Sequence, residues 1–442
     1  MKKLIALVGL LFSCPVWMMA QEAAAEVPTL DSGNTAWILA ATMLVMLMTI
    51  PGLAFFYGGL VRRKNVLSIM MQCVVLTAVI TIEWIVYGYT AVFGTSFSET
   101  WLGGFIGGFD KFFLHGIQLD TLTSGNIPEL LFVLFQCKFA VITPALIVGA
   151  FAERIKFSGF LVFSILWSLL VYNPMAHWVW GGGWMQEMGA IDFAGGTVVH
   201  INAGISALVM ALLLGRRRGY GSNPIVPHNV PFVVLGTALL WLGWFGFNAG
   251  SGLGADGLAA NAFLVTTLAT AVAATTWMVL EWIINKKPTV IGICTGAVAG
   301  LVAITPAAGT ADAMGSLFIG LVASCVCYFF VAYIKPKMKY DDSLDAFGVH
   351  GVGGFVGAIL TGVFATQFIT GEGGVQGALY GDWHQLGVQV IVNIAAIVFS
   401  AVMTFIIFKI TDKLVGVRVS EKDESIGLDI SQHGEIAYSE GE

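Results

Sequence analysis

The sequence predicts an all-α membrane protein with eleven transmembrane helices, of which the first ten form a 5+5 inverted repeat. Of the 442 residues, 57% are hydrophobic and only 11% are charged, whereas soluble proteins carry about 25% charged residues. Apolar stretches long enough to cross a bilayer, which takes about 20 helical residues, recur along the chain. The basic residues also fall almost entirely in alternate connections between these stretches.

Residues 1–20 are typical of a secretory signal peptide. Lys2 and Lys3 precede a short apolar core, and the small residue Ala20 ends the segment. The alternative is an additional transmembrane helix, but the apolar run is short for a span and polar residues follow it. After signal removal five cysteines remain, all in predicted spans: Cys73, Cys137, Cys294, Cys325 and Cys327. This odd number supports neither a disulfide framework nor a metal site.

The apolar stretches after the signal give eleven predicted spans. They cover approximately residues 35–59, 66–94, 128–152, 157–180, 195–215, 230–250, 261–284, 290–306, 313–334, 347–369 and 384–411. The expected organisation is therefore a signal peptide at 1–20, a transmembrane domain at 34–411 and a tail at 412–442.

The distribution of basic residues predicts the orientation of the chain. Lysines and arginines cluster in every second connection, at 62–64, 154–156, 216–218, 286–287 and 335–339, whereas the opposite connections contain only Lys111. Connections rich in lysine and arginine stay in the cytoplasm. The N-terminus is therefore expected outside the cell and the tail inside.

His200 and His350 lie inside long apolar stretches, in the fifth and the tenth predicted span. Five helices followed by five more run in opposite directions, which is the arrangement of an inverted repeat. The two histidines then occupy corresponding positions in the two halves, near the middle of the membrane. Because an ionisable residue within a span is costly, its default interpretation is functional. The pair predicts a transport path.

Several segments together resemble the ammonium transporter (Amt/Rh) superfamily, on its bacterial Amt side. The resemblance covers about residues 34–438. It rests on PGLAFFYGGLVRRKN (51–65), FQCKFA (135–140), AFAERI (150–155), HWVWGGG (177–183), DFAGGTVVHINAG (192–204), GWFGFNAGS (243–251), DAFGVHG (345–351) and GLDISQHGEIAY (427–438).

The resemblance implies a homotrimer in the bacterial inner membrane, in which each subunit has its own pore and moves ammonium inward. It further implies that a PII-type signal protein docks on the cytoplasmic face, for which Arg216, Arg217 and Arg218 are candidate residues. By motif, the implied recruitment site is Phe139, Trp180 and Ser251, the Phe gate is Phe139 with Phe247, the pore histidines are His200 and His350, the buried acid is Asp192, and Trp244 and Asn248 are supporting residues.

These residue types suit the discrimination of ammonium from potassium. The two cations are nearly the same size, but only ammonium donates hydrogen bonds and loses a proton. Trp180 and Phe139 would attract the cation through their ring faces, and Ser251 would accept a hydrogen bond that potassium cannot donate. For each aromatic residue the alternative is ordinary packing.

Beyond the gate, neutral ammonia enters an apolar pore far more cheaply than a dehydrated cation does. His200 and His350 would share one proton between their Nδ1 atoms and remain neutral as a pair. Asp192 precedes the fifth span, where it is expected to cap the helix and supply a negative field. Direct proton acceptance by Asp192 is the alternative.

Other function classes fit the sequence less well. No metal cluster, nucleophile triad or phosphate-binding loop is evident, so neither an enzyme nor a cofactor is predicted, and no nucleic-acid partner is expected. The open alternatives are an ammonium sensor, which the short tail disfavours, and an Rh-like channel for neutral ammonia or carbon dioxide, which Trp180 disfavours. Two further charges within spans, Glu83 and Lys138, have no role assigned by these patterns.

Overall fold

The structure, a computed structural model, describes residues 29–222 and 225–438, and the predicted signal peptide at 1–20 lies outside this part. Within it, eleven helical segments are long and apolar enough to cross a membrane. The predicted number of spans is therefore confirmed. The segments are Ser32–Leu60, Arg63–Phe93, Glu129–Phe151, Phe157–Glu187, Gly196–Leu214, Val230–Gly250, Gly257–Asn285, Val290–Ala307, Ala313–Met338, Phe347–Phe364 and Trp383–Val415.

Several spans are divided into shorter elements. The α-helices are α2 (Ser32–Leu47), α3 (Ala54–Leu60), α4 (Val66–Glu83), α5 (Tyr89–Phe93), α6 (Glu129–Phe151), α7 (Phe157–Trp167), α8 (Asn173–Trp180), α9 (Trp184–Glu187), α10 (Asn202–Leu214), α11 (Val230–Gly250), α12 (Gly257–Asn285), α13 (Val290–Ile304), α14 (Ala313–Phe329), α15 (Lys335–Met338), α16 (Val352–Phe364), α17 (Gln367–Thr370), α18 (Trp383–Val415) and α19 (Glu421–Ile426). A short antiparallel pair, β1 (Leu122–Thr123) with β2 (Ile127–Pro128), lies in the connection before α6.

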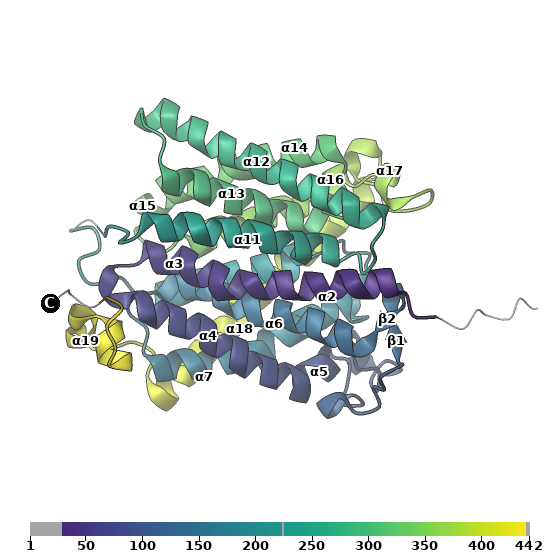
Figure 1. Cartoon of the computed structure of the whole chain (residues 1–442), viewed down its shortest axis with the longest axis horizontal. Coiled ribbons are helices and arrows are strands. Elements are labelled where there is room, and N and C mark those ends of the chain that lie inside the picture. The colour runs from purple at the N-terminus through teal and green to yellow at the C-terminus, as the bar shows by residue number, and fades with distance from the viewer. Residues whose placement is uncertain (1–28, 223–224, 439–442) are drawn as a thin grey trace, which may run out of the picture.

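The helices lie side by side as a bundle, with β1 and β2 at one end and α19 at the other (Figure 1). The tail packs against the basic connections at its end of the bundle. The main-chain N–H of Arg218 donates to Glu424 at 2.5 Å, and that of Ser68 donates to Asp429 at 2.8 Å. The last span continues to Val415, so the predicted boundary at 411 falls inside a helix rather than at its end.

Two spans contain a π-helical turn at the same relative place. The fifth begins with the turn Gly196–Ile201, and the tenth begins with the turn Phe347–Gly351. Each turn carries one of the two membrane histidines and passes directly into an α-helix, α10 or α16. The extra residue in a π-turn redirects the side chains around it, and such turns are frequent at functional sites. Both histidines are thus presented by the same local device.

Glycines allow these two spans to meet backbone to backbone. A methyl group placed on Gly204 would lie 2.1 Å from the nitrogen of Gly351, and one on Gly354 would lie 2.8 Å from the Cβ atom of His200. Small residues at helix contacts let backbones approach this closely in membranes. The crossing brings the two π-turns, and hence His200 and His350, together in the buried interior of the bundle.

Candidate functional site

His200 and His350 face each other in the buried interior. Their Nδ1 atoms are 3.3 Å apart, and their rings lie nearly parallel with an interplanar angle of 18°. Exposure is only 1% for His200 and 4% for His350. A contact between two ring nitrogens is a hydrogen bond only when one of them carries the proton. The Nε2 atom of His200 has no hydrogen-bond partner in the described structure, which leaves it available to a passing molecule.

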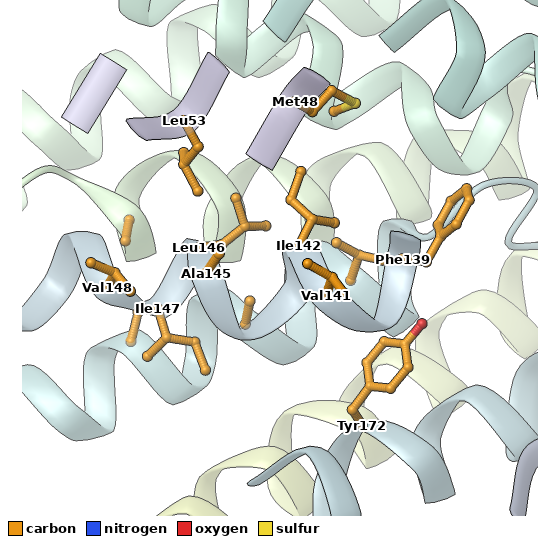
Figure 2. Close-up of a cluster of buried hydrophobic side chains, with 14 of the residues drawn as sticks. Met48, Leu53, Phe139, Val141, Ile142, Ala145, Leu146, Ile147, Val148 and Tyr172 are labelled. Carbon is orange, nitrogen blue, oxygen red and sulfur yellow. The ribbon is translucent and has the colours of Figure 1, made fainter. Parts of the chain in front are cut away.

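Both histidines line a narrow apolar cavity of about 10 Å³. Its other lining residues come from five spans, and they are almost entirely aliphatic or aromatic: Met48, Leu53, Phe56, Ile142, Leu146, Val199, Leu240, Trp244, Phe247 and Val298. Figure 2 shows Met48 and Leu53 from the first span opposite Ile142 and Leu146 of α6. The sequence analysis missed these aliphatic residues, because a leucine facing a pore carries no signal that separates it from one facing the core.

Phe247, which lines this cavity, stacks on a second phenylalanine ring. Phe139 on α6 and Phe247 on α11 have ring centroids 4.3 Å apart and an interplanar angle of 27°. Both are buried, with exposures of 1% and 0%. The ring of Phe247 also lies 6.1 Å from that of His200. The Phe pair therefore stands directly next to the histidine pair.

The predicted recruitment residue Trp180 contacts Phe139, whereas His200 lies beside Phe247. Trp180, at the end of α8, meets Phe139 edge to face at a centroid distance of 5.9 Å. Ser251, one helical turn after Phe247, donates its hydroxyl hydrogen to the Phe247 carbonyl at 2.8 Å. Since the hydrogen is committed to the backbone, the hydroxyl oxygen presents lone pairs to a cation. Trp180 and Ser251 are both partly exposed.

Asp192 caps the start of the fifth span. Its carboxylate accepts four backbone N–H groups, from Gly195, Gly196, Thr197 and Val198, at 2.5–3.0 Å. Burial raises the pKa of Asp192, and these four donors oppose the rise. The side chain is only 7% exposed. Both of its oxygens therefore accept hydrogen bonds from the helix N-terminus rather than facing the recruitment residues. Its main-chain carbonyl in turn accepts the indole N–H of Trp180 at 2.8 Å.

The two supporting residues occupy different positions. Trp244 stacks on His200, with centroids 5.4 Å apart and an interplanar angle of 18°, and its indole N–H donates to Thr305. It therefore forms a wall of the histidine site itself, a closer role than the motif indicated. Asn248 is fully buried and donates to Thr266 at 2.9 Å, between α11 and α12.

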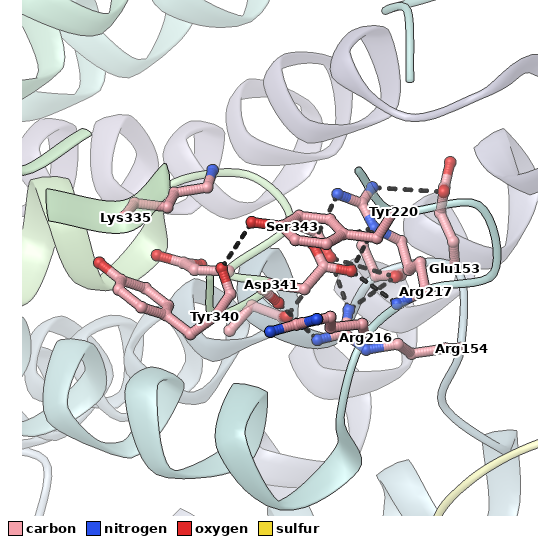
Figure 3. Close-up of polar contacts among 12 residues, drawn as sticks. Glu153, Arg154, Arg216, Arg217, Tyr220, Lys335, Tyr340, Asp341 and Ser343 are labelled. Carbon is pink, nitrogen blue, oxygen red and sulfur yellow. Dashed lines mark hydrogen bonds and ion pairs between the residues drawn. The ribbon is translucent and has the colours of Figure 1, made fainter. Parts of the chain in front are cut away.

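On its other side, His350 also lines a larger cavity of about 260 Å³ at the end of the bundle with the basic connections. Lys335 and Asp345 form an ion pair of 2.5 Å at its edge. Next to it, Arg217 is ion-paired with Asp341 at 2.8 Å and with Glu153 at 3.3 Å (Figure 3). Burial opposes ionisation of Glu153 and Asp341, yet Arg217 holds the pKa of both carboxyls below their ordinary values.

This network corrects one interpretation of the basic connections. Arg217 is only 6% exposed and is fully engaged by two carboxylates, so it is not available to dock a partner protein. Arg216 and Arg218 remain exposed. A run of three arginines at a span end gives no sign of which one turns inward, because the partners Glu153 and Asp341 are distant in sequence.

The two unassigned charges differ in their surroundings. Glu83 accepts hydrogen bonds from Asn173 at 2.7 Å and Ser168 at 3.1 Å. These partners were not evident from the sequence. Lys138 is partly exposed, whereas the adjacent Phe139 is buried. No hydrogen bond or ion pair of Lys138 occurs within the described ranges.

Comparisons with known proteins agree with this geometry. Residues 36–438 match the family described as Ammonium Transporter Family. An ammonium transporter of Aquifex aeolicus is 52% identical over 414 residues, covering 93% of this chain and 94% of that protein, and one of Bacillus subtilis is 48% identical, covering 93% and 100%. Among solved structures, Saccharomyces cerevisiae Mep2 superimposes with a TM-score of 0.84 at 35% identity, covering 93% of this chain and 92% of that one. A structure titled Sensor Amt Protein has a TM-score of 0.82 at 30% identity, covering 91% and 98%.

Proposed function

The chain belongs to the Ammonium Transporter Family, and from this premise we propose that it moves ammonium inward by deprotonating it and passing ammonia through the twin-histidine pore. Family membership makes it a multi-pass membrane transporter of ammonium rather than an enzyme, homologous to bacterial plasma-membrane proteins. The single observation that carries the proposed mechanism is the direct succession of Trp180, the Phe139–Phe247 stack and the histidine pair.

Recruitment uses the faces of Trp180 and Phe139 together with the Ser251 hydroxyl. A cation over an aromatic face gains about 0.5–2 kcal/mol, depending on its desolvation. Because the Ser251 hydrogen is donated to the Phe247 carbonyl, its oxygen accepts a hydrogen bond from ammonium. Potassium forms no such bond, so the site favours ammonium by donor chemistry rather than by size.

Passage beyond the Phe pair requires loss of the proton. The cavity of about 10 Å³ is lined almost wholly by apolar groups, and a dehydrated charge there would cost far more than a neutral molecule does. A cation carried through would need acceptors that the aliphatic walls lack. Ammonium therefore gives one proton to solvent water on the Trp180 side of the Phe pair, and ammonia enters the cavity.

The histidine pair then supplies polar contacts without a fixed charge. One proton shared at the 3.3 Å Nδ1 contact keeps the pair neutral, since a second proton would place two like charges side by side in a buried site. The free Nε2 of His200 interacts with ammonia. The pair also relays the released proton inward, so that transport carries net charge.

The remaining features of the proposal concern assembly and location. The protein forms a homotrimer in the inner membrane, with its N-terminus outside after cleavage at residue 20 and its regulatory tail, 412–442, in the cytoplasm. A PII-type signal protein docks on the face that carries Arg216 and Arg218. The paired π-turns at His200 and His350 support the inverted repeat that this orientation requires.

The alternatives are an ammonium sensor and an Rh-like neutral gas channel. The likeness to a structure titled Sensor Amt Protein, at 30% identity, supports the sensor alternative. The relatives that are 52% and 48% identical, however, are named ammonium transporters. The aromatic vestibule argues against the second, because a cation site gives a neutral gas no advantage.

Currents across a supported membrane test the proposal. Purified wild-type protein should give a current on addition of ammonium but not of potassium, and the His200→Ala/His350→Ala variant should lose it. A Ser324→Ala variant, which removes a buried hydrogen bond to Ala273 between α12 and α14, is the control. Ammonia equilibration into vesicles without any wild-type current would instead favour a neutral channel.

A further inference from the structure

A line of buried polar side chains runs along α18, the eleventh span, which lies outside the 5+5 repeat. Gln385, Gln389, Asn393, Ser400 and Thr404 are all 0–6% exposed. Their spacings of four and seven residues place them on one face of the helix. Each forms a hydrogen bond with the fifth span or with the loop before it. Buried polar groups within a membrane are costly unless they are paired and used.

The side chain of Gln389 forms hydrogen bonds with both backbone groups of Ile191, the residue before Asp192. Its Oε1 atom accepts the N–H of Ile191 at 2.8 Å, and its Nε2 atom donates to the Ile191 carbonyl at 2.8 Å. The same Nε2 atom donates to the carbonyl of Ala358 on α16 at 3.1 Å. One amide side chain thus joins the loop before the His200 span to the helix that follows His350.

The loop held by Gln389 sets the position of Trp180. The residue after Ile191 is Asp192, whose carbonyl accepts the Trp180 indole N–H at 2.8 Å. Asn393, one turn further along α18, accepts the hydroxyl of Thr197 at 2.7 Å, and the N–H of Thr197 donates to the Asp192 carboxylate. Asp192 is therefore fixed from both sides by side chains of α18.

A non-polar residue at position 389 would leave the Ile191 N–H and carbonyl unpaired in a buried place. Leaving such groups unpaired costs more than the bond itself contributes, so the loop would move to find other partners. Since Trp180 is tied to the next residue of that loop, its ring would move too. The contact between the rings of Trp180 and Phe139 depends on that placement.

We infer that Gln389 is a positioning residue for the ammonium-recruitment site, acting through Ile191 and Asp192 on the ring of Trp180. The inference rests on the proposed function of that site. It assigns a role to the eleventh span: α18 holds the vestibule loop of the first half against α16 of the second half. Asn393 assists through Thr197.

The test is a double-mutant cycle between Gln389→Leu and Trp180→Leu, with uptake of radiolabelled methylammonium as the assay. Gln389→Leu should raise KM about three- to twentyfold, the range of one membrane hydrogen bond, and leave the maximal rate within about twofold. In the Trp180→Leu background, Gln389→Leu should add little, because its effect passes through the missing ring. Ser324→Ala is the control for the loss of a buried hydrogen bond far from the vestibule.

A cryo-electron microscopy structure of the Gln389→Leu variant gives a readout independent of transport. The Trp180 ring should be displaced from Phe139, while the fold and the histidine pair are retained. If Gln389→Leu does not fold, Gln389→Glu replaces it, since a carboxylate keeps the acceptor for the Ile191 N–H and loses both donated bonds. Additive effects in the cycle, or an unmoved Trp180 with wild-type KM, would overturn the inference. Absence of wild-type uptake would instead refute the proposed function.

Discussion

Replacing Gly204 with alanine should separate the two histidines without altering either of them. The added methyl group would lie 2.1 Å from the nitrogen and 2.2 Å from the Cα atom of Gly351. Ordinary contacts of a Cβ atom begin at 3.4 Å, so the fifth and tenth spans would have to move apart by about 1.3 Å at their crossing. Both neighbours are backbone atoms, which no side-chain rotation moves away.

The histidine contact leaves no room for that shift. The Nδ1 atoms are already 3.3 Å apart, and a further displacement of about 1 Å ends the hydrogen bond. We expect the free energy of unfolding to fall by about 1–3 kcal/mol, as for other overpacked sites. The transport rate should fall by about two orders of magnitude, the effect of a 1 Å misplacement of reacting groups.

The assays are thermal unfolding in detergent and methylammonium uptake in proteoliposomes. Gly387→Ala on α18 is the matched control, because a methyl group there meets nothing within 4 Å. This control should unfold at or slightly above the wild-type temperature, since alanine favours helix by about 1 kcal/mol over glycine. Wild-type uptake and unaltered unfolding of Gly204→Ala would refute the idea that backbone contact sets the histidine distance.

Three further predictions concern the vestibule and the cytoplasmic network. Ser251→Ala should lower the ratio of ammonium to potassium current by about tenfold or more, because a hydrogen bond to a charged partner is lost. Trp180→Leu should raise KM for methylammonium about two- to thirtyfold, the range of a cation–π contact, and an unchanged KM would remove the ring from recruitment. Since Glu153 and Asp341 have lowered pKa values beside Arg217, their stabilising effect should be present above about pH 4.5 and lost as pH falls below it. In Arg217→Met, Arg62 still pairs with Glu153 at 2.7 Å and Arg154 still lowers the pKa of Asp341, so the loss of stability with acid, measured by unfolding between pH 7 and 4, should be smaller than in wild type but not abolished.

The spans follow from local signals in the sequence, whereas the proposed site residues follow from the resemblance of their motifs to a known family. Length and apolarity identify a membrane helix whatever it packs against, so the count of eleven is confirmed. The ends are less accurate, as at Glu187, Met338 and Val415, because polar residues continue a helix beyond the lipid. The motif residues Phe139, Trp180, Phe247, His200 and His350 lie together in one continuous path.

Other parts of the site depend on contacts between distant segments and could not be predicted. Leu53 and Ile142 line the cavity at the two histidines, but their hydrophobicity is what any buried residue of a span shows. Gln389 forms a hydrogen bond with a loop 198 residues away. From the sequence alone, a glutamine near the end of a span is interpreted as an interfacial residue. Arg217 pairs with Asp341 across 124 residues, and neighbouring Arg216 and Arg218 have the same local signals.

The size of the cavity at the histidines limits how molecules share the route. About 10 Å³ is close to the space that one water molecule needs, and ammonia is of similar size. Two molecules therefore cannot pass each other there, and transport along the proposed route occurs in single file. Ammonia arriving from one side of the membrane occupies the same position as ammonia arriving from the other. A high ammonia concentration inside the vesicle should therefore slow the influx of labelled and unlabelled substrate equally. It should not accelerate the exchange of labelled for unlabelled substrate.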